Sequence, residues 1–151
     1  MQSTGFSILR KETYLARITN SIGSQTYRSI YVVNNGVVVD ILEEGNLACA
    51  HFVSAILQNS GLLPSVHATV TGLEVALQKA GWYKTDTLEV GAVIIWEAST
   101  AQHGHPHIGF YVGNNAAISN SSKRKKIVKH DIRFGKEQRS IQALYTHKLL
   151  E

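Results

Sequence analysis

The sequence has little cysteine, proline or charge. Its single cysteine, Cys49, excludes an intrachain disulfide, so a disulfide-stapled fold is ruled out. Two prolines and no repetitive tract exclude a proline-rich, low-complexity chain. Charged residues make up only 17% and hydrophobic residues 44%, which is typical of a globular rather than a disordered protein. At 151 residues we expect one domain, spanning residues 1–151, with a core that needs no disulfide.

Long apolar runs are also absent. The longest, such as 37–39 and 93–96, have the size of strands, so we expect no membrane span. The N-terminal stretch MQSTGFSILRKETYLA lacks the basic-then-apolar order of a signal peptide. We therefore expect a monomer that is cytoplasmic as synthesised, and its final compartment stays open, because non-classical export to a cell wall is compatible with this N-terminus.

Periodicity and turn residues predict the first elements of the fold. Apolar residues at helical intervals predict a helix over residues 6–18. Asn34-Asn35-Gly36 lies between SIYVV and VVVDI, which predicts a β-hairpin. Asn46 is a favoured N-cap type, and it predicts a helix that runs to about Asn59 and is terminated by Gly61.

The second half of the chain is predicted to be richer in strands. A capping box over residues 71–74 predicts a helix that ends at Gly81. Strands are predicted in GAVIIW, HIGFYVG, AAIS and IVKHDIRF. This order predicts an α+β fold in which helices pack on one antiparallel β-sheet.

The position of Cys49 on its predicted helix supports two interpretations. It belongs to an apolar stripe with residues 52, 53, 56 and 57, and free cysteine often packs as a small buried hydrophobe. It also falls in the first turn after Asn46, where the helix dipole and unpaired N–H groups stabilise a thiolate. The same N–H groups could bind the oxyanion of a tetrahedral intermediate. A core cysteine and a nucleophile both remain open at this point.

A nucleophilic thiol needs a base, and the strand that begins at His107 offers one. His107 shares a strand face with Gly109, which leaves room for a helix end to approach. If the hairpin loop is Asn114-Asn115, Asn120 becomes the diagonal neighbour of His107 and could orient its ring. With a three-residue loop, Ser119 would take that place.

These motifs together resemble a known superfamily. ACAHFVS, GAVIIWE and HIGFYVGNN, within residues 45–121, look like the papain-like peptidoglycan hydrolases, namely the NlpC-type endopeptidases and the CHAP amidohydrolases. The resemblance implies a papain-like domain with the catalytic cysteine at a helix N-terminus and no cofactor. It implies a cysteine peptidase or amidase acting on peptidoglycan peptides, with Cys49 as nucleophile, His107 as base and acid, and Asn120 as the third residue.

Four alternatives accompany this interpretation. His103, His105 and His107 alternate, so they could bind Zn²⁺ on an extended strand, although Gly104 and Pro106 favour a loop. The net charge of +4 and a basic segment favour an anionic polymer as partner; the segment contains Lys123, Arg124, Lys125, Lys126 and Lys129. The same fold could also serve as a noncatalytic wall-binding module, or as an acyltransferase with the same Cys-His pair.

Overall fold

The computed structural model describes residues 5–99 and 104–151, and within them the chain has an α+β architecture. Three α-helices occur in these ranges: α1 (Arg10–Asn20), α2 (Cys49–Asn59) and α3 (Val70–Lys79). The strands are β1 (Tyr31–Asn34), β2 (Val37–Asp40), β3 (Trp82–Lys84), β4 (Val93–Trp96), β5 (His107–Gly113), β6 (Ala116–Ser121), β7 (Lys126–Asp131) and β8 (Ile141–His147).

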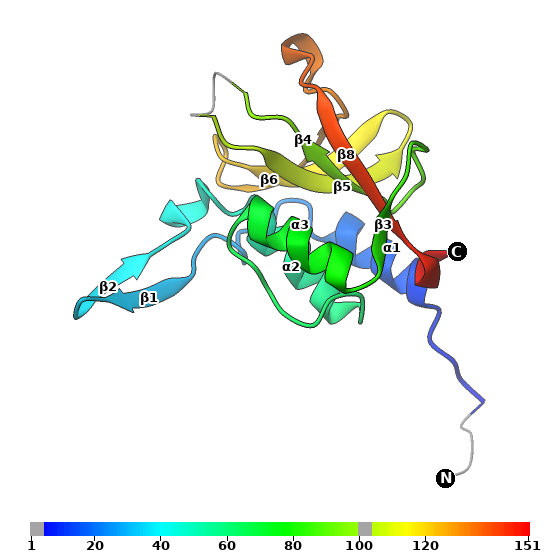
Figure 1. Ribbon diagram of the computed structural model, residues 1–151, viewed down its shortest axis with the longest axis horizontal. Coiled ribbons are helices and arrows are strands. Elements are labelled where there is room, and N and C mark those ends of the chain that lie inside the picture. Colours follow the sequence, from blue (N-terminus) through cyan, green and yellow to red (C-terminus); the bar gives the residue numbers. More distant parts are fainter. Residues whose placement is uncertain (1–4, 100–103) are drawn as a thin grey trace.

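Six of the strands form one antiparallel sheet in the order β3-β8-β4-β5-β6-β7, and β1 pairs with β2 alone. The helices gather on one side of the large sheet, as Figure 1 shows, and α2 contacts β5 and β6. The main core lies between these layers and includes Phe52, Leu57 and Phe110. A smaller cluster around Trp96 covers the other face. The predicted packing of helices on one antiparallel sheet is therefore confirmed.

The first helix begins later than predicted. It starts at Arg10 and leaves Phe6, Ile8 and Leu9 exposed, with 91%, 86% and 61% of their surface accessible. Only Tyr14 and Ile18 of this helix are buried. The apolar pattern upstream of Arg10 therefore has no core to pack against, and that pattern was the basis of the wrong boundary.

The predicted hairpin is present as β1 and β2. Asn34 pairs with Val37, and Asn35 and Gly36 have φ values of +50° and +79°. Positive φ at both central positions is the geometry that an Asn-Gly turn favours. The hairpin projects from the body of the protein (Figure 1).

The two later helices are capped differently from the predictions. Asn46 is not the N-cap of α2, because it follows a short 3₁₀ helix (Glu43–Gly45) and its Nδ2 donates to Glu43 Oε2 at 2.8 Å. The helix instead begins at Cys49 without a side-chain cap. The N-cap of α3 is Thr69, whose Oγ1 accepts from the backbone N–H of Gly72.

Two strands were absent from the sequence predictions. β8 lies between β3 and β4, and β3 forms the edge of the sheet.

Among the described residues, no helix has both the length and the apolar character that crossing a membrane requires.

Candidate active site

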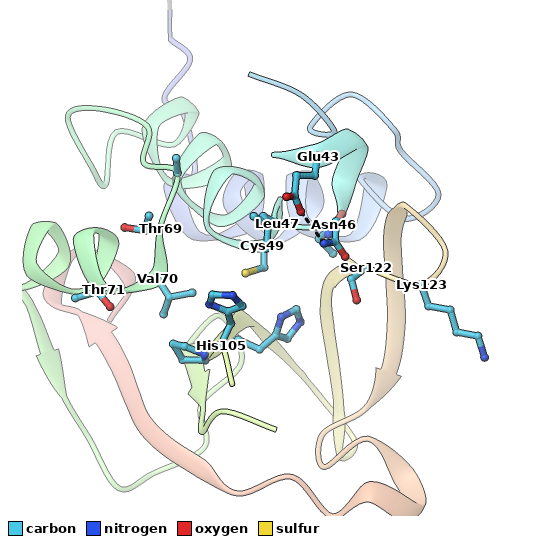
Figure 2. Close-up of a pocket in the computed structure, with 14 residues that line it drawn as sticks. Glu43, Asn46, Leu47, Cys49, Thr69, Val70, Thr71, His105, Ser122 and Lys123 are labelled. Carbon is cyan, nitrogen blue, oxygen red and sulfur yellow. Dashed lines mark hydrogen bonds between the residues drawn. The ribbon is translucent and has the colours of Figure 1, made fainter. Parts of the chain in front are cut away.

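Cys49 is the first residue of α2, and its side chain lies in a cavity. The residue is partly exposed, and Figure 2 shows its sulfur directed into that cavity. The backbone N–H groups of Cys49 itself, Ala50 and Ile108 face the sulfur. The rest of the predicted apolar stripe is buried: Phe52, Val53, Ile56 and Leu57. The structure thus places the thiol at the helix N-terminus, at the margin of the core rather than beneath it.

A loop with a strained backbone precedes Cys49. Glu43, Glu44 and Gly45 all have positive φ, at +52°, +54° and +95°. The carboxylate of Asp40 holds this loop, because it accepts from the backbone N–H groups of Leu42 at 3.0 Å and Glu44 at 2.9 Å. Non-glycine residues with positive φ persist only where the surroundings determine them, so this loop has a defined shape ahead of the thiol.

His107 opens β5 and lines the same cavity as Cys49. Its side chain is 9% exposed, and its Nε2 lies 2.9 Å from Ser119 Oγ. Ring nitrogen Nδ1 is thus the one without a hydrogen bond among the described residues. Within the described residues no hydrogen bond joins the thiol to the imidazole, and such bonds are often long before a substrate binds.

The third predicted residue, Asn120, does not orient His107. A bulge between Tyr111 and Gly113 shifts the register, so Gly109 lies opposite Ser119. The hydroxyl of Ser119, the alternative for a longer loop, therefore contacts the imidazole. The side chain of Asn120 is buried and donates from Nδ2 to the carbonyl of Gly45 at 2.9 Å, which ties β6 to the loop ahead of Cys49.

Sequence reasoning missed a histidine behind Ser119. The hydroxyl oxygen of Ser119 lies 2.7 Å from Nε2 of His130 on β7, and His130 Nδ1 lies 2.7 Å from the carbonyl oxygen of Asp131. The ring of His130 stacks on Phe134 with centroids 4.1 Å apart. The available signal was that β7 continues the antiparallel sheet, which puts His130 diagonally beside Ser119.

Gly109 has a different use from the predicted one. A Cβ at this position would lie 2.7 Å from the carbonyl oxygen of Ile118, 2.8 Å from Ser119 Cβ and 3.1 Å from the ring of Trp96. The missing side chain therefore makes room for Ser119 and Trp96 next to His107, and not for the end of a helix.

Arg139 is a buried cation beside the site that sequence reasoning also missed. Its Nε donates to the carbonyl of Glu97 at 2.8 Å, and one terminal nitrogen donates to the carbonyl of His105 at 3.0 Å. These bonds connect the end of β4 with the segment that enters β5 at His107. Its charge favours the Cys49 thiolate and disfavours a protonated His107.

Burial controls the protonation states of the pair. Desolvation raises the pKa of the Cys49 thiol, although the facing N–H groups and Arg139 oppose the shift. Desolvation also lowers the pKa of His107 to about 3, and the positive charges of Arg139 and His130 act in the same direction. At neutral pH the site therefore holds a neutral thiol and a neutral imidazole, so proton transfer accompanies nucleophilic attack.

We expect iodoacetamide to alkylate Cys49 slowly at pH 7, because only the thiolate reacts and burial raises the pKa of the thiol. The alkylation rate should still be rising by about tenfold per pH unit beyond pH 8.5. Stopped samples analysed by mass spectrometry give the rate, with a short cysteine peptide as control. A plateau reached below pH 7 would instead reveal a preformed thiolate-imidazolium pair.

The cavity has a volume of about 870 Å³. Figure 2 shows Glu43, Ser122 and Lys123 on one side of Cys49, and Thr69, Val70 and Thr71 on the other. Lys123 is the part of the basic segment that reaches the cavity; Arg124 and Lys129 are exposed, and Lys125 and Lys126 are half-buried. Polar and apolar side chains both line the cavity around the thiol.

The described residues contain no cluster of three or more His, Cys, Asp or Glu side chains placed to hold a metal ion. Of the predicted histidine set, His103 lies outside the described residues, His105 is exposed and His107 is buried against Ser119.

No protein-family model matches this chain, and comparison with curated proteins found no match. The family resemblance therefore depends on the sequence motifs named above.

Proposed function

We propose that the protein hydrolyses amide bonds with Cys49 as the nucleophile, and that its substrates are peptidoglycan peptides. The observation that carries the proposal is that Cys49, at the start of α2, and His107, at the start of β5, line one cavity. Nucleophilic catalysis requires a base near the nucleophile in space, and the fold brings these two residues to the same cavity from segments far apart in the chain. The substrate class follows from the resemblance of the motifs to papain-like wall hydrolases.

The reaction uses both side chains in two stages. The Cys49 thiol gives its proton to His107 Nδ1 while the sulfur attacks the carbonyl carbon, and a tetrahedral oxyanion forms. First-turn N–H groups of α2, which have no partner within the helix, stabilise that oxyanion. Its collapse breaks the C–N bond, and His107 protonates the leaving amine. Water then attacks the thioester, again through His107, and releases the acid and the thiol.

Digestion of purified sacculi by wild type and by Cys49→Ala tests this proposal. We expect wild type to release soluble peptides whose masses identify one cleaved amide bond, and the variant to release none. Equal fragment patterns from both proteins would contradict hydrolysis by Cys49. Products joined to an added amine would show instead that the thioester is transferred, as in an acyltransferase.

Binding without cleavage is the remaining outcome. If both proteins sediment with sacculi and neither releases peptides, the fold serves as a wall-binding module. Repeating the sedimentation at 300 mM salt then separates binding through the basic segment, which weakens as counterions return, from binding in the cavity.

A further inference from the structure

The strongest unassigned feature is a chain of three polar side chains behind His107. His107 on β5, Ser119 on β6 and His130 on β7 are joined through Ser119 Oγ at 2.9 and 2.7 Å. Ser119 is 1% exposed and His107 9% exposed, so water has little access to the contact between them, whereas His130 is half-buried. Aromatic rings enclose them: Trp96 lies 5.5 Å from His107 and 5.6 Å from His130 between centroids. Such buried polar networks are ordered when every member is satisfied.

The far end of the chain sets the direction of every hydrogen bond. The carbonyl oxygen of Asp131 can only accept, so Nδ1 of His130 carries a hydrogen. In a neutral ring His130 Nε2 is then an acceptor, and the hydroxyl of Ser119 donates to it. The oxygen of Ser119 is left to accept from Nε2–H of His107. His107 Nδ1 is therefore unprotonated, and among the described residues no hydrogen bond engages it.

We propose that His130, acting through Ser119, is a positioning residue that holds His107 in the tautomer protonated at Nε2, leaving Nδ1 free to accept the Cys49 proton. This inference rests on the proposed function for its catalytic meaning, whereas the tautomer itself is a property of the resting protein. A histidine in the wrong tautomer cannot act as the base, so its orienting partners affect turnover although they never touch the substrate.

Protonation of His130 reverses the chain. A charged His130 carries hydrogens on both nitrogens and donates to Ser119, whose hydroxyl must then donate to His107 Nε2 and move the hydrogen of His107 to Nδ1. The charged group that acts on His130 is Asp131 on its own strand. Arg133 acts on Asp131 in turn, and Arg139, ahead of β8, acts on His107. Burial lowers the pKa of His130, and Asp131 partly offsets this. The reversal therefore requires a lower pH than an ordinary histidine would set.

Nitrogen-15 NMR of histidine-labelled protein tests the proposal without an activity assay, because the two ring nitrogens shift according to which one is protonated. We expect wild-type His107 to be the Nε2–H tautomer at pH 7.5 and to switch to Nδ1–H as His130 titrates. His130→Gln, whose side-chain oxygen can still accept from Ser119, should keep the Nε2–H tautomer without the switch. His130→Leu and Ser119→Ala should lose the switch and part of the tautomer preference.

Kinetics give the second readout. We expect His130→Leu to lower kcat at least about tenfold at pH 7.5 with KM unchanged. His130→Gln should keep kcat at pH 7.5, and it should lose the fall in kcat at low pH that protonation of His130 causes in the wild type. The proposal would be overturned, even if amide cleavage is found, by wild-type His107 protonated at Nδ1 at pH 7.5. It would also be overturned if the His107 tautomer stayed the same when His130 is titrated or substituted. If the His107 tautomer switches with His130 in a protein that cleaves no amide, the result would support the positioning role of His130 and contradict the proposed function.

Discussion

A His107→Gln variant is expected to cleave amide bonds about 10²- to 10⁴-fold more slowly than the wild type. Burial raises the pKa of Cys49, so the thiol is protonated near neutral pH and needs a base during attack. His107 lines the cavity with Nδ1 unengaged, and its other nitrogen is held by buried Ser119. Initial rates on a peptide identified from the sacculus digest give kcat and kcat/KM for both proteins.

The matched control is His51→Gln. His51 lies on the same helix two residues from Cys49, but its Nδ1 contacts the carbonyl of Tyr27 and its ring packs against the Tyr27 ring, away from the cavity. We expect this variant to keep the wild-type rate within about twofold. Far-UV circular dichroism shows whether both variants are folded. A folded His107→Gln protein with the wild-type rate would remove His107 from the mechanism.

Mild acid is expected to destabilise the protein before its carboxylates titrate. The pKa of His107 is about 3 in the folded protein against 6.5 for the unperturbed group, so between these values the unfolded chain binds more protons. Stability is therefore complete above pH 6.5 and is lost as pH falls toward 3, at about 1.4 kcal/mol per pH unit. From pH 6.5 to 5 the loss from His107 alone is about 2 kcal/mol.

Urea unfolding at pH 7.5, 6.5, 5.5 and 5 measures this loss. The informative quantity is the slope of unfolding free energy against pH, because His107→Gln also changes the absolute stability. We expect a shallower slope in the variant. The pH dependence that is left comes from His130, whose pKa is also lowered by burial. Asp40 and Asp131 titrate below this window, since hydrogen bonds hold their pKa values under the ordinary one. Parallel slopes in both proteins would contradict a buried neutral His107.

Local signals predicted the elements that depend on local chemistry. The Asn-Gly turn produced the β1–β2 hairpin, and the apolar stripe of α2 identified the face that packs on the sheet. The start of α2 was predicted wrongly, because Asn46 binds Glu43 in a 3₁₀ turn instead of capping the helix. Residue type alone does not distinguish these two uses of an asparagine.

The site was predictable only as far as its first two members. Cys49 and His107 could be chosen from their places on a helix and a strand, whereas the third residue depended on register. The bulge at Val112 shifts the pairing of β5 with β6 by one residue, so that Ser119 and not Asn120 lies opposite Gly109. His130 requires the sheet order as well, since its contact to Ser119 crosses from β7 to β6.

The bond from Asn120 to Gly45 spans 75 residues and has a consequence for the order in which the protein assembles. Contacts so far apart in the chain form late, after the entropy of closing the intervening loop has been overcome. The loop that presents the thiol is therefore anchored only when the β5–β6 hairpin has docked. A nascent chain still lacking β6 carries Cys49 as an ordinary thiol, so the cavity that Cys49 shares with His107 arrives only with the finished tertiary structure.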